Sequence, residues 1–248
     1  MNNLLALTAR ELKAFWYSPI AYVVGAVFML LQGFVFWLLI NALNDPRSDP
    51  SWTIGQAFFG GTIFYWFSVL LITPLLTMRT FSEEKRTGTI ELLLTAPVTD
   101  AQVVLAKFLG AWTAYSLLWA FTLAFFLVLR LLTPFDWGPV LIGYLGTWLL
   151  GGVLLAIGIL ASSLTRNQVI AAVLSFVVLT LCFCIGFLQV FFTDPETVRL
   201  IQYFSLIEHL TDFGKGIIDT RPVIFYLSLT AIALFVTGRV IANPRWRS

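Results

Sequence analysis

The chain has 248 residues, of which 59% are hydrophobic and only 11% are charged. A water-soluble globular domain carries about 25% charged residues, so the composition excludes an ordinary soluble fold. The net charge of +2 is too small to indicate a nucleic-acid partner. Apolar runs of about 20 residues can cross a bilayer as helices, and they lack the alternation of barrel strands. We expect one all-α integral membrane domain over residues 1–248.

The N-terminal segment, residues 3–17, has the pattern of an amphipathic helix. Leu5 and Leu12 fall on one face, whereas Arg10 and Lys13 fall on another. Such a helix lies in the plane of the membrane interface. We therefore predict an interfacial elbow helix, and the alternative is a simple anchor.

Six hydrophobic segments follow, and each is predicted to cross the membrane as a helix. Thr99 and Gln102 form a capping-box pattern at the start of the third segment. Asn243 and Pro244 end the last one. The predicted spans are residues 20–43, 57–78, 100–132, 138–163, 168–192 and 222–242.

The distribution of basic residues predicts the orientation, because cytosolic loops of membrane proteins are rich in Lys and Arg. With the N-terminus inside, ten of the 15 Lys and Arg residues are cytosolic and five are external. Both termini and the loop 79–107 are then cytosolic, and residues 44–56 and 193–221 face outward. We expect a multi-pass protein of the cell (inner) membrane.

Known catalytic and nucleotide-binding motifs do not occur in the sequence. It has no H-E-x-x-H, no G-x-S-x-G and no phosphate-binding G-x-x-x-x-G-K-[ST]. Cys182 and Cys184 could bind a soft metal ion, but buried cysteines more often act as small apolar residues. We predict no catalytic residue, no metal site and no cofactor bound by this chain. Energy for uphill movement would have to come from another chain.

The loop 79–107 interrupts the apolar spans with the sequence RTFSEEKRTGTIELLLTAPVTDAQVVLAK. Its charged start extends the second span into water, and Gly88 breaks that helix. Residues 90–94 predict a second short helix with an apolar knob, which Pro97 ends. An exposed knob of this kind fits the groove of a soluble partner. The alternative is insertion among lipid headgroups.

This loop resembles the signature of ABC type-2 transporter permeases, as does the six-span layout with its elbow helix. The matching residues are Arg79, Glu83, Glu84, Gly88, Thr89, Ile90, Glu91, Leu93, Leu94, Thr95, Pro97 and Lys107. The predicted ATPase-coupling site consists of these residues without Thr95, together with Arg86 and Leu92. The resemblance implies a cytosolic ABC ATPase subunit that binds ATP and Mg²⁺, and a second permease copy in a homo- or heterodimer.

The external segment 193–221 predicts an amphipathic helix that lies on the membrane. Asp194 is placed to cap it, and Pro195 suits the first turn. The predicted apolar stripe contains Leu200, Phe204, Ile207 and Leu210.

The end of this segment resembles permeases of the gliding-motility (Gld-type) branch, through the pattern H-x-x-x-F-x-x-G-x-I-D-T-R-x-x-x-x-Y-L-S at residues 209–228. Permeases of that branch often pair with a membrane-anchored auxiliary protein that has a large external domain. His209, Asp219 and Arg221 are accordingly predicted to form an external docking surface, although a helix cap and an interfacial anchor would also explain them.

Small residues in span four, in the pairs Gly152–Ala156 and Gly158–Ser162, permit close helix packing. They could serve a dimer interface or packing within one subunit. The expected function is the permease of an ATP-driven exporter or mechanical transducer. The alternative is a non-transporting scaffold or an intramembrane enzyme, and the sequence does not indicate a cargo.

Overall fold

The computed structural model describes residues 2–44, 54–89 and 99–243, and within these ranges every regular element is a helix. Six helical segments are long and apolar enough to cross a membrane. The predicted all-α, six-span fold is therefore confirmed. The helices are α1 (Asn2–Trp16), α2 (Pro19–Asn44), α3 (Ile54–Phe58), α4 (Ile63–Thr77), α5 (Ser82–Thr87), α7 (Asp100–Leu132), α8 (Trp137–Ser163), α9 (Gln168–Cys184), the 3-10 helix η1 (Ile185–Val190), α10 (Pro195–Phe204), α11 (Leu206–Gly214) and α12 (Thr220–Ala242).

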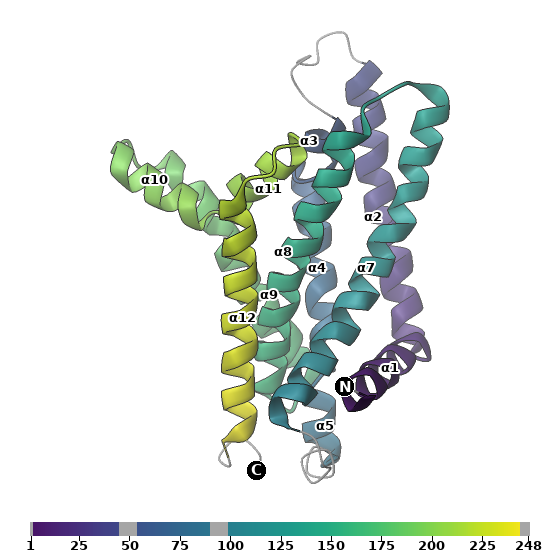
Figure 1. Ribbon diagram of the computed structural model, residues 1–248, viewed down its shortest axis with the longest axis vertical. Helices are drawn as coiled ribbons and strands as arrows, with labels where there is room; N and C mark the ends of the chain where they lie inside the picture. Colours follow the sequence, from purple (N-terminus) through teal and green to yellow (C-terminus); the bar gives the residue numbers. More distant parts are fainter. Residues whose placement is uncertain (1, 45–53, 90–98, 244–248) are drawn as a thin grey trace.

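The long helices run side by side along the molecule, and short helices lie at the two ends (Figure 1). α1 crosses one end near α5, and both chain termini lie at this end, which we call the α1 end. α3 and α11 lie toward the opposite end, where α10 projects sideways from the bundle; we call this the α10 end. Large apolar side chains such as Leu30, Leu181 and Phe235 are exposed on the long helices, as expected where helices face lipid.

The predicted helix boundaries agree closely with the structure for most spans. α7 covers residues 100–132 as predicted, and the capping box between Thr99 and Gln102 is present at its start. The second span differs, because it begins at Ile63 and not at residue 57. The chain turns at Gly60, whose φ of 85° favours glycine, and the Trp66 indole donates to the Gly60 carbonyl at 3.1 Å. This turn separates α3 from α4.

α8 is the central helix, since it contacts α4, α7, α9, α11 and α12. Its small residues allow this crowding. A methyl group at Gly151 would collide with the Tyr115 ring, and one at Gly158 would collide with Thr77. The Gly158–Ser162 pair therefore serves packing within the subunit.

The external segment forms two helices and not the single predicted stripe. Ser205 ends α10 and caps α11, because its Oγ accepts a hydrogen bond from the Glu208 amide at 3.3 Å. Leu210 is buried against the bundle, whereas Leu200 and Phe204 are exposed on α10. The break at Ser205 thus divides the predicted stripe between two different environments.

Candidate functional site

Lys107 is the centre of a network of ion pairs at the α1 end. It lies two turns into α7, and its side chain is only 2% exposed. Its Nζ donates to Glu84 Oε1 of α5 at 2.7 Å and to Glu11 Oε1 of α1 at 3.4 Å. The Phe81 ring lies 5.1 Å from the same ammonium group, close enough for a cation–π contact. One buried cation therefore connects three helices.

α1 is fixed to the bundle through the helix face that carries Glu11. A methyl group at Gly110 of α7 would lie 2.8 Å from Glu11 Cβ, so the two helices approach as closely as a glycine allows. Arg10 pairs with Glu11 at 2.9 Å and lies 3.8 Å from Glu84. Leu5, on the predicted apolar face, is exposed. That α1 lies in the membrane interface stays a prediction.

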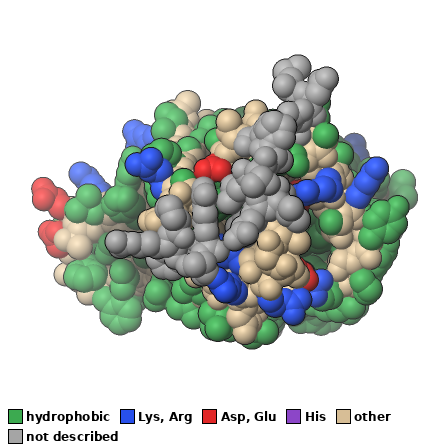
Figure 2. Space-filling view, turned by 90° about the horizontal axis from the view of Figure 1, so that it is seen from below, with side chains coloured by type: hydrophobic (Ala, Val, Ile, Leu, Met, Phe, Trp, Pro, Cys, Tyr) green, Lys and Arg blue, Asp and Glu red, His purple; other side chains and the backbone are tan. Residues whose placement is uncertain are grey.

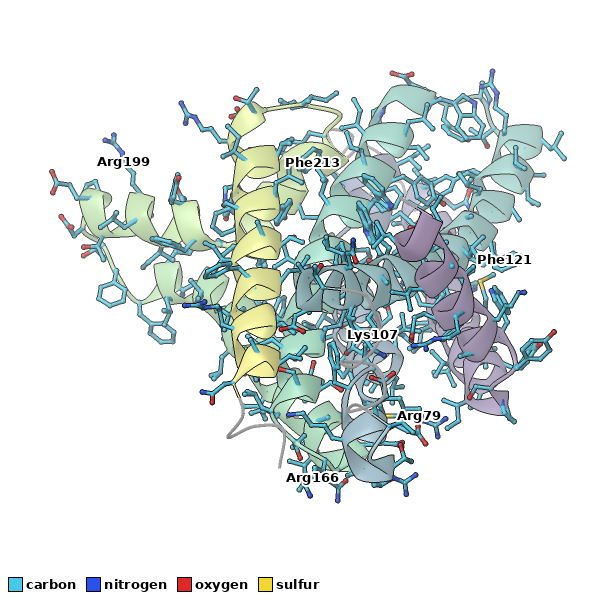
Figure 3. All side chains as sticks on the ribbon, turned by 60° about the horizontal axis from the view of Figure 1, so that its bottom comes forward. Arg79, Lys107, Phe121, Arg166, Arg199 and Phe213 are labelled. Atoms are coloured by element: carbon cyan, nitrogen blue, oxygen red, sulfur yellow. The ribbon has the colours of Figure 1, made fainter. Side chains whose placement is uncertain are left out.

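Arg79 organises a second network, just beyond the end of α4. Its Nε donates to Gln168 Oε1 at 3.1 Å, and its Nη1 donates to Ser18 Oγ at 3.3 Å. Gln168, the first residue of α9, donates in turn to Glu83 Oε2 at 3.0 Å. Figure 3 shows Arg79 and Lys107 near each other at the α1 end, while Arg199 projects from α10.

The end of α8 supports the start of α5. The amides of Phe81 and Ser82 both donate to Ser162 Oγ at 3.1 Å, and Ser162 Oγ donates to the Met78 carbonyl at 3.1 Å. Lys85 Nζ reaches the Ser163 carbonyl at 2.5 Å. The first amides of a helix have no partner within the helix, so Ser162 satisfies groups that α5 cannot satisfy alone.

α5 ends at Gly88, which has a left-handed φ of 73°. Arg86, Gly88 and Thr89 are exposed at this tip, and Arg86 pairs with Glu83 at 3.3 Å. The other predicted coupling residues, Ile90, Glu91, Leu92, Leu93, Leu94 and Pro97, lie outside the described residues.

Four predicted coupling residues are thus brought together: Arg79, Glu83, Glu84 and Lys107. Sequence reasoning missed their partners Glu11, Gln168 and Ser18, and also Ser162, which accepts from the Phe81 and Ser82 amides, because each is distant in the chain. The only signal in the sequence was Glu11, an acidic residue between the basic residues of the N-terminal helix. Lys and Arg side chains lie at several places over this end of the molecule (Figure 2).

These contacts suit a mechanical role. α5 comes directly before residues 90–98 and the first turns of α7 come directly after them, so the Lys107–Glu84 pair joins the two sides of that segment. Through Lys107, α1, α5 and α7 are linked to one another beside that segment. Within the described ranges, no group of three or more His, Cys, Asp or Glu side chains could hold a metal ion.

The predicted docking residues at the α10 end lie in different environments. His209 is buried; its Nε2 lies 2.9 Å from the Tyr203 carbonyl, and its ring centroid is 4.7 Å from that of Phe225. Asp219 accepts from the Arg221 amide at 3.1 Å and so caps α12. These residues line a polar cavity of about 520 Å³. The prediction that His209 lies on the outer surface is corrected by its burial.

Comparison with known proteins agrees with this architecture. A family model described as ABC-2 family transporter protein matches residues 5–238, which is nearly the whole chain. Comparison with curated proteins finds no significant match. The match spans α1, the six membrane helices and the external helices, and the chain therefore belongs to the ABC-2 transporter family, as a multi-pass membrane protein.

Proposed function

We propose that this chain is the permease subunit of an ATP-driven exporter or mechanical transducer, energised by a separate cytosolic ATPase. The ATPase would bind ATP and Mg²⁺ and contact the segment around residues 86–98. The observation that carries the proposal is the Lys107–Glu84–Glu11 network, which holds both sides of that segment to α1.

In this mechanism the ATPase displaces the segment around residues 86–98, which we call the coupling segment, when it closes on ATP. α5 does not move freely, because Ser162 fixes it to α8 and Glu84 fixes it to α7. Arg79 and Gln168 extend the connection to α9. The displacement therefore passes into several membrane helices at once, as alternation between two states of the bundle requires.

Two substitutions in the coupling segment test this mechanism. Glu91→Lys and Leu93→Asp should each weaken ATPase binding by about 2 kcal/mol or more, the loss typical of a residue central to an interface. The bundle should stay folded, and Arg199→Ala at the α10 end is the control. Co-purification with the ATPase and stimulated ATP hydrolysis are the measurements. Unchanged binding and hydrolysis in both variants would remove this segment from the coupling path.

The proposed orientation places both termini and α5 in the cytosol. Ser82 is buried, so the exposed Thr87 is the better labelling site. In a chain with Cys182 and Cys184 replaced by Ala, we expect a membrane-impermeant maleimide to label Glu196→Cys from outside and to leave Thr87→Cys unlabelled. The reverse pattern would show that the orientation is inverted.

We also propose a second permease copy and an external auxiliary protein that docks near Asp219 and Arg221, as in the gliding-motility branch. Both side chains are well exposed, and their charged groups lie 4.0 Å apart. Because His209 is buried, it would support this surface and not contact the partner. Asp219→Arg and Arg221→Asp, singly and together, should reduce pull-down of the auxiliary protein while the permease–ATPase complex persists. Normal pull-down by both single variants would leave only the helix-capping role.

A further inference from the structure

A cavity of about 320 Å³ lies between α1 and the bundle, at the level where the α1 end meets the long helices. The apolar part of its lining, which we call the floor, includes Phe15, Leu75 and Leu76. The charged part of its lining, which we call the rim, includes Arg79 and Glu84. A cavity with an apolar floor and a charged rim, at the end of membrane helices, matches the two parts of a phospholipid.

The charges on the rim are of both signs, with carboxylates in excess. Glu11, Glu83 and Glu84 line the cavity together with Arg79 and Lys107. Lys107 is already shared between Glu84 Oε1 and Glu11 Oε1. The second oxygen, Glu84 Oε2, is buried and has no hydrogen-bond partner among the described residues. A buried carboxylate oxygen without a donor is costly, so a ligand that brings an N–H group would satisfy it.

Arg79 provides the complementary charge on the same rim. A guanidinium has five N–H donors, and the bonds to Gln168 and Ser18 use two of them. The Arg79 side chain is 40% exposed, so an anion can reach it. Arginine commonly pairs with phosphate in this way.

We propose that this cavity binds a phospholipid with a primary-amine headgroup, of the phosphatidylethanolamine class. Its ammonium group donates to Glu84 Oε2, its phosphate pairs with Arg79, and an acyl chain covers Phe15 and Leu75. A choline headgroup has the same charge but no N–H donor, and a glycerol headgroup has no cation. The lipid fills the space between α1 and the bundle, so its binding stabilises the attachment of α1.

The test uses the purified full chain without an ATPase, so its result is independent of the proposed coupling. Native mass spectrometry would measure retention of phosphatidylethanolamine, phosphatidylcholine and phosphatidylglycerol offered in equal amounts, with free phosphoethanolamine as a fourth probe. We expect retention of phosphatidylethanolamine to exceed that of phosphatidylcholine by about tenfold, or about 1.4 kcal/mol. Equal retention of these two lipids would overturn the proposal. If free phosphoethanolamine bound as strongly as phosphatidylethanolamine, the apolar floor would not contribute to binding, and that part of the proposal would be overturned.

Two variants on α1 separate the cavity from the fold. Ala14 lines the cavity and is exposed, so Ala14→Trp fills the space without altering a charge. Ala9 is exposed on the same helix and does not line the cavity, so Ala9→Trp is the matched control. We expect Ala14→Trp to abolish the preference for phosphatidylethanolamine and Ala9→Trp to retain it. An unchanged preference in Ala14→Trp would place the lipid elsewhere and refute the site.

Discussion

Two short helices at opposite ends of the bundle, α5 and α10, differ in how firmly tertiary contacts attach them. α5 has only six residues, yet Ser82 and Lys85 are buried, and the amides of Ser82 and of the preceding Phe81 donate to Ser162 of α8. α10 has ten residues, and none of them is buried. Isolated helices of either length are marginal in water, so tertiary contacts decide how firmly each is held. Helix length is therefore a poor guide to attachment.

The difference also separates two kinds of surface. At the α1 end, α1 and α5 are each connected to more than one long helix. At the α10 end, α10 is connected mainly to η1 and α11, and Gln202 reaches Gln189 at 3.3 Å. Changes in α10 are therefore expected to affect the stability of the bundle less than changes in α5.

The largest expected effect comes from removing the cation at the centre of the α1 end. Lys107→Met leaves the Glu84 and Glu11 carboxylates without their shared partner. Breaking a buried ion pair costs about 3–5 kcal/mol, and we expect about 3 kcal/mol because these carboxylates remain 18% and 20% exposed. Thermal unfolding of the purified protein, followed by size-exclusion chromatography, would measure the loss.

The double variant Lys107→Met with Glu84→Gln provides the control for charge. It removes one carboxylate along with the cation, so it should be more stable than Lys107→Met alone. Arg86→Met removes an exposed partner of Glu83 and should change stability by about 0–1 kcal/mol. If Lys107→Met and Arg86→Met lowered stability equally, the buried Lys107 network would contribute no more than the exposed Arg86–Glu83 pair.

The spans could be predicted from the sequence because long apolar runs determine where they lie and local capping signals, such as Thr99, determine where they begin. Arg79 and Lys107 were singled out through the resemblance of the loop to the permease signature. The sequence could not predict that Glu11 and Gln168 would meet them, because that depends on how α1 and α9 pack. Similarly, the Gly158–Ser162 pair of span four allowed two interpretations until the close approach of Gly158 to Thr77 placed it in packing within the subunit.

A pair of leucines tests the contrast at the α10 end itself. Leu210 on α11 is fully buried, whereas Leu200 on α10 is 64% exposed. Leu210→Ala should destabilise the protein by about 2–5 kcal/mol, the usual cost of a cavity in a packed core, and the lower half of this range is expected. Leu200→Ala should have almost no effect on thermal unfolding. Comparable losses from the two substitutions would mean that α10 is covered, for instance by a second copy.

The sequence pattern could not separate these two leucines, since both fit one helical stripe. The separation arises because Ser205 has an extended ψ of 116° and caps α11. Serine is common at helix starts, so the signal was present, but an uninterrupted helix was equally compatible with it.

A smaller effect is expected where α8 supports α5. Ser162→Ala leaves the Phe81 and Ser82 amides without their acceptor, and an unsatisfied buried donor costs about 1–3 kcal/mol. The neighbouring Ser163 is equally buried, but among the described residues its hydroxyl bonds only to the Leu160 carbonyl of its own helix. Ser163→Ala should therefore cost less than Ser162→Ala in the same unfolding measurement. Equal costs would show that the support of α5 does not depend on Ser162.

The smallest effect on the whole protein is expected at the start of α10. Hydrogen bonds from the Thr197 side chain and then from its backbone amide lower the pKa of Asp194. Because the native pKa is lowered, the cap stabilises α10 above the pKa of the unfolded side chain, about 3.9. This stabilisation is lost as the pH falls through the lower native value. Asp194→Ala should remove the cap at neutral pH.

The mobility of a spin label at Leu200 would report on this cap. We expect the label to become more mobile in Asp194→Ala, and in the otherwise unaltered protein once the pH falls below the lowered native pKa of Asp194. Asp194→Asn keeps an acceptor and removes the ionisable group, so its label should not respond to pH. Global unfolding should be unchanged in both variants, since α10 buries no residue. A drop in melting temperature as large as that of Ser162→Ala would show that α10 is held as firmly as α5, and the contrast between the two ends would fail.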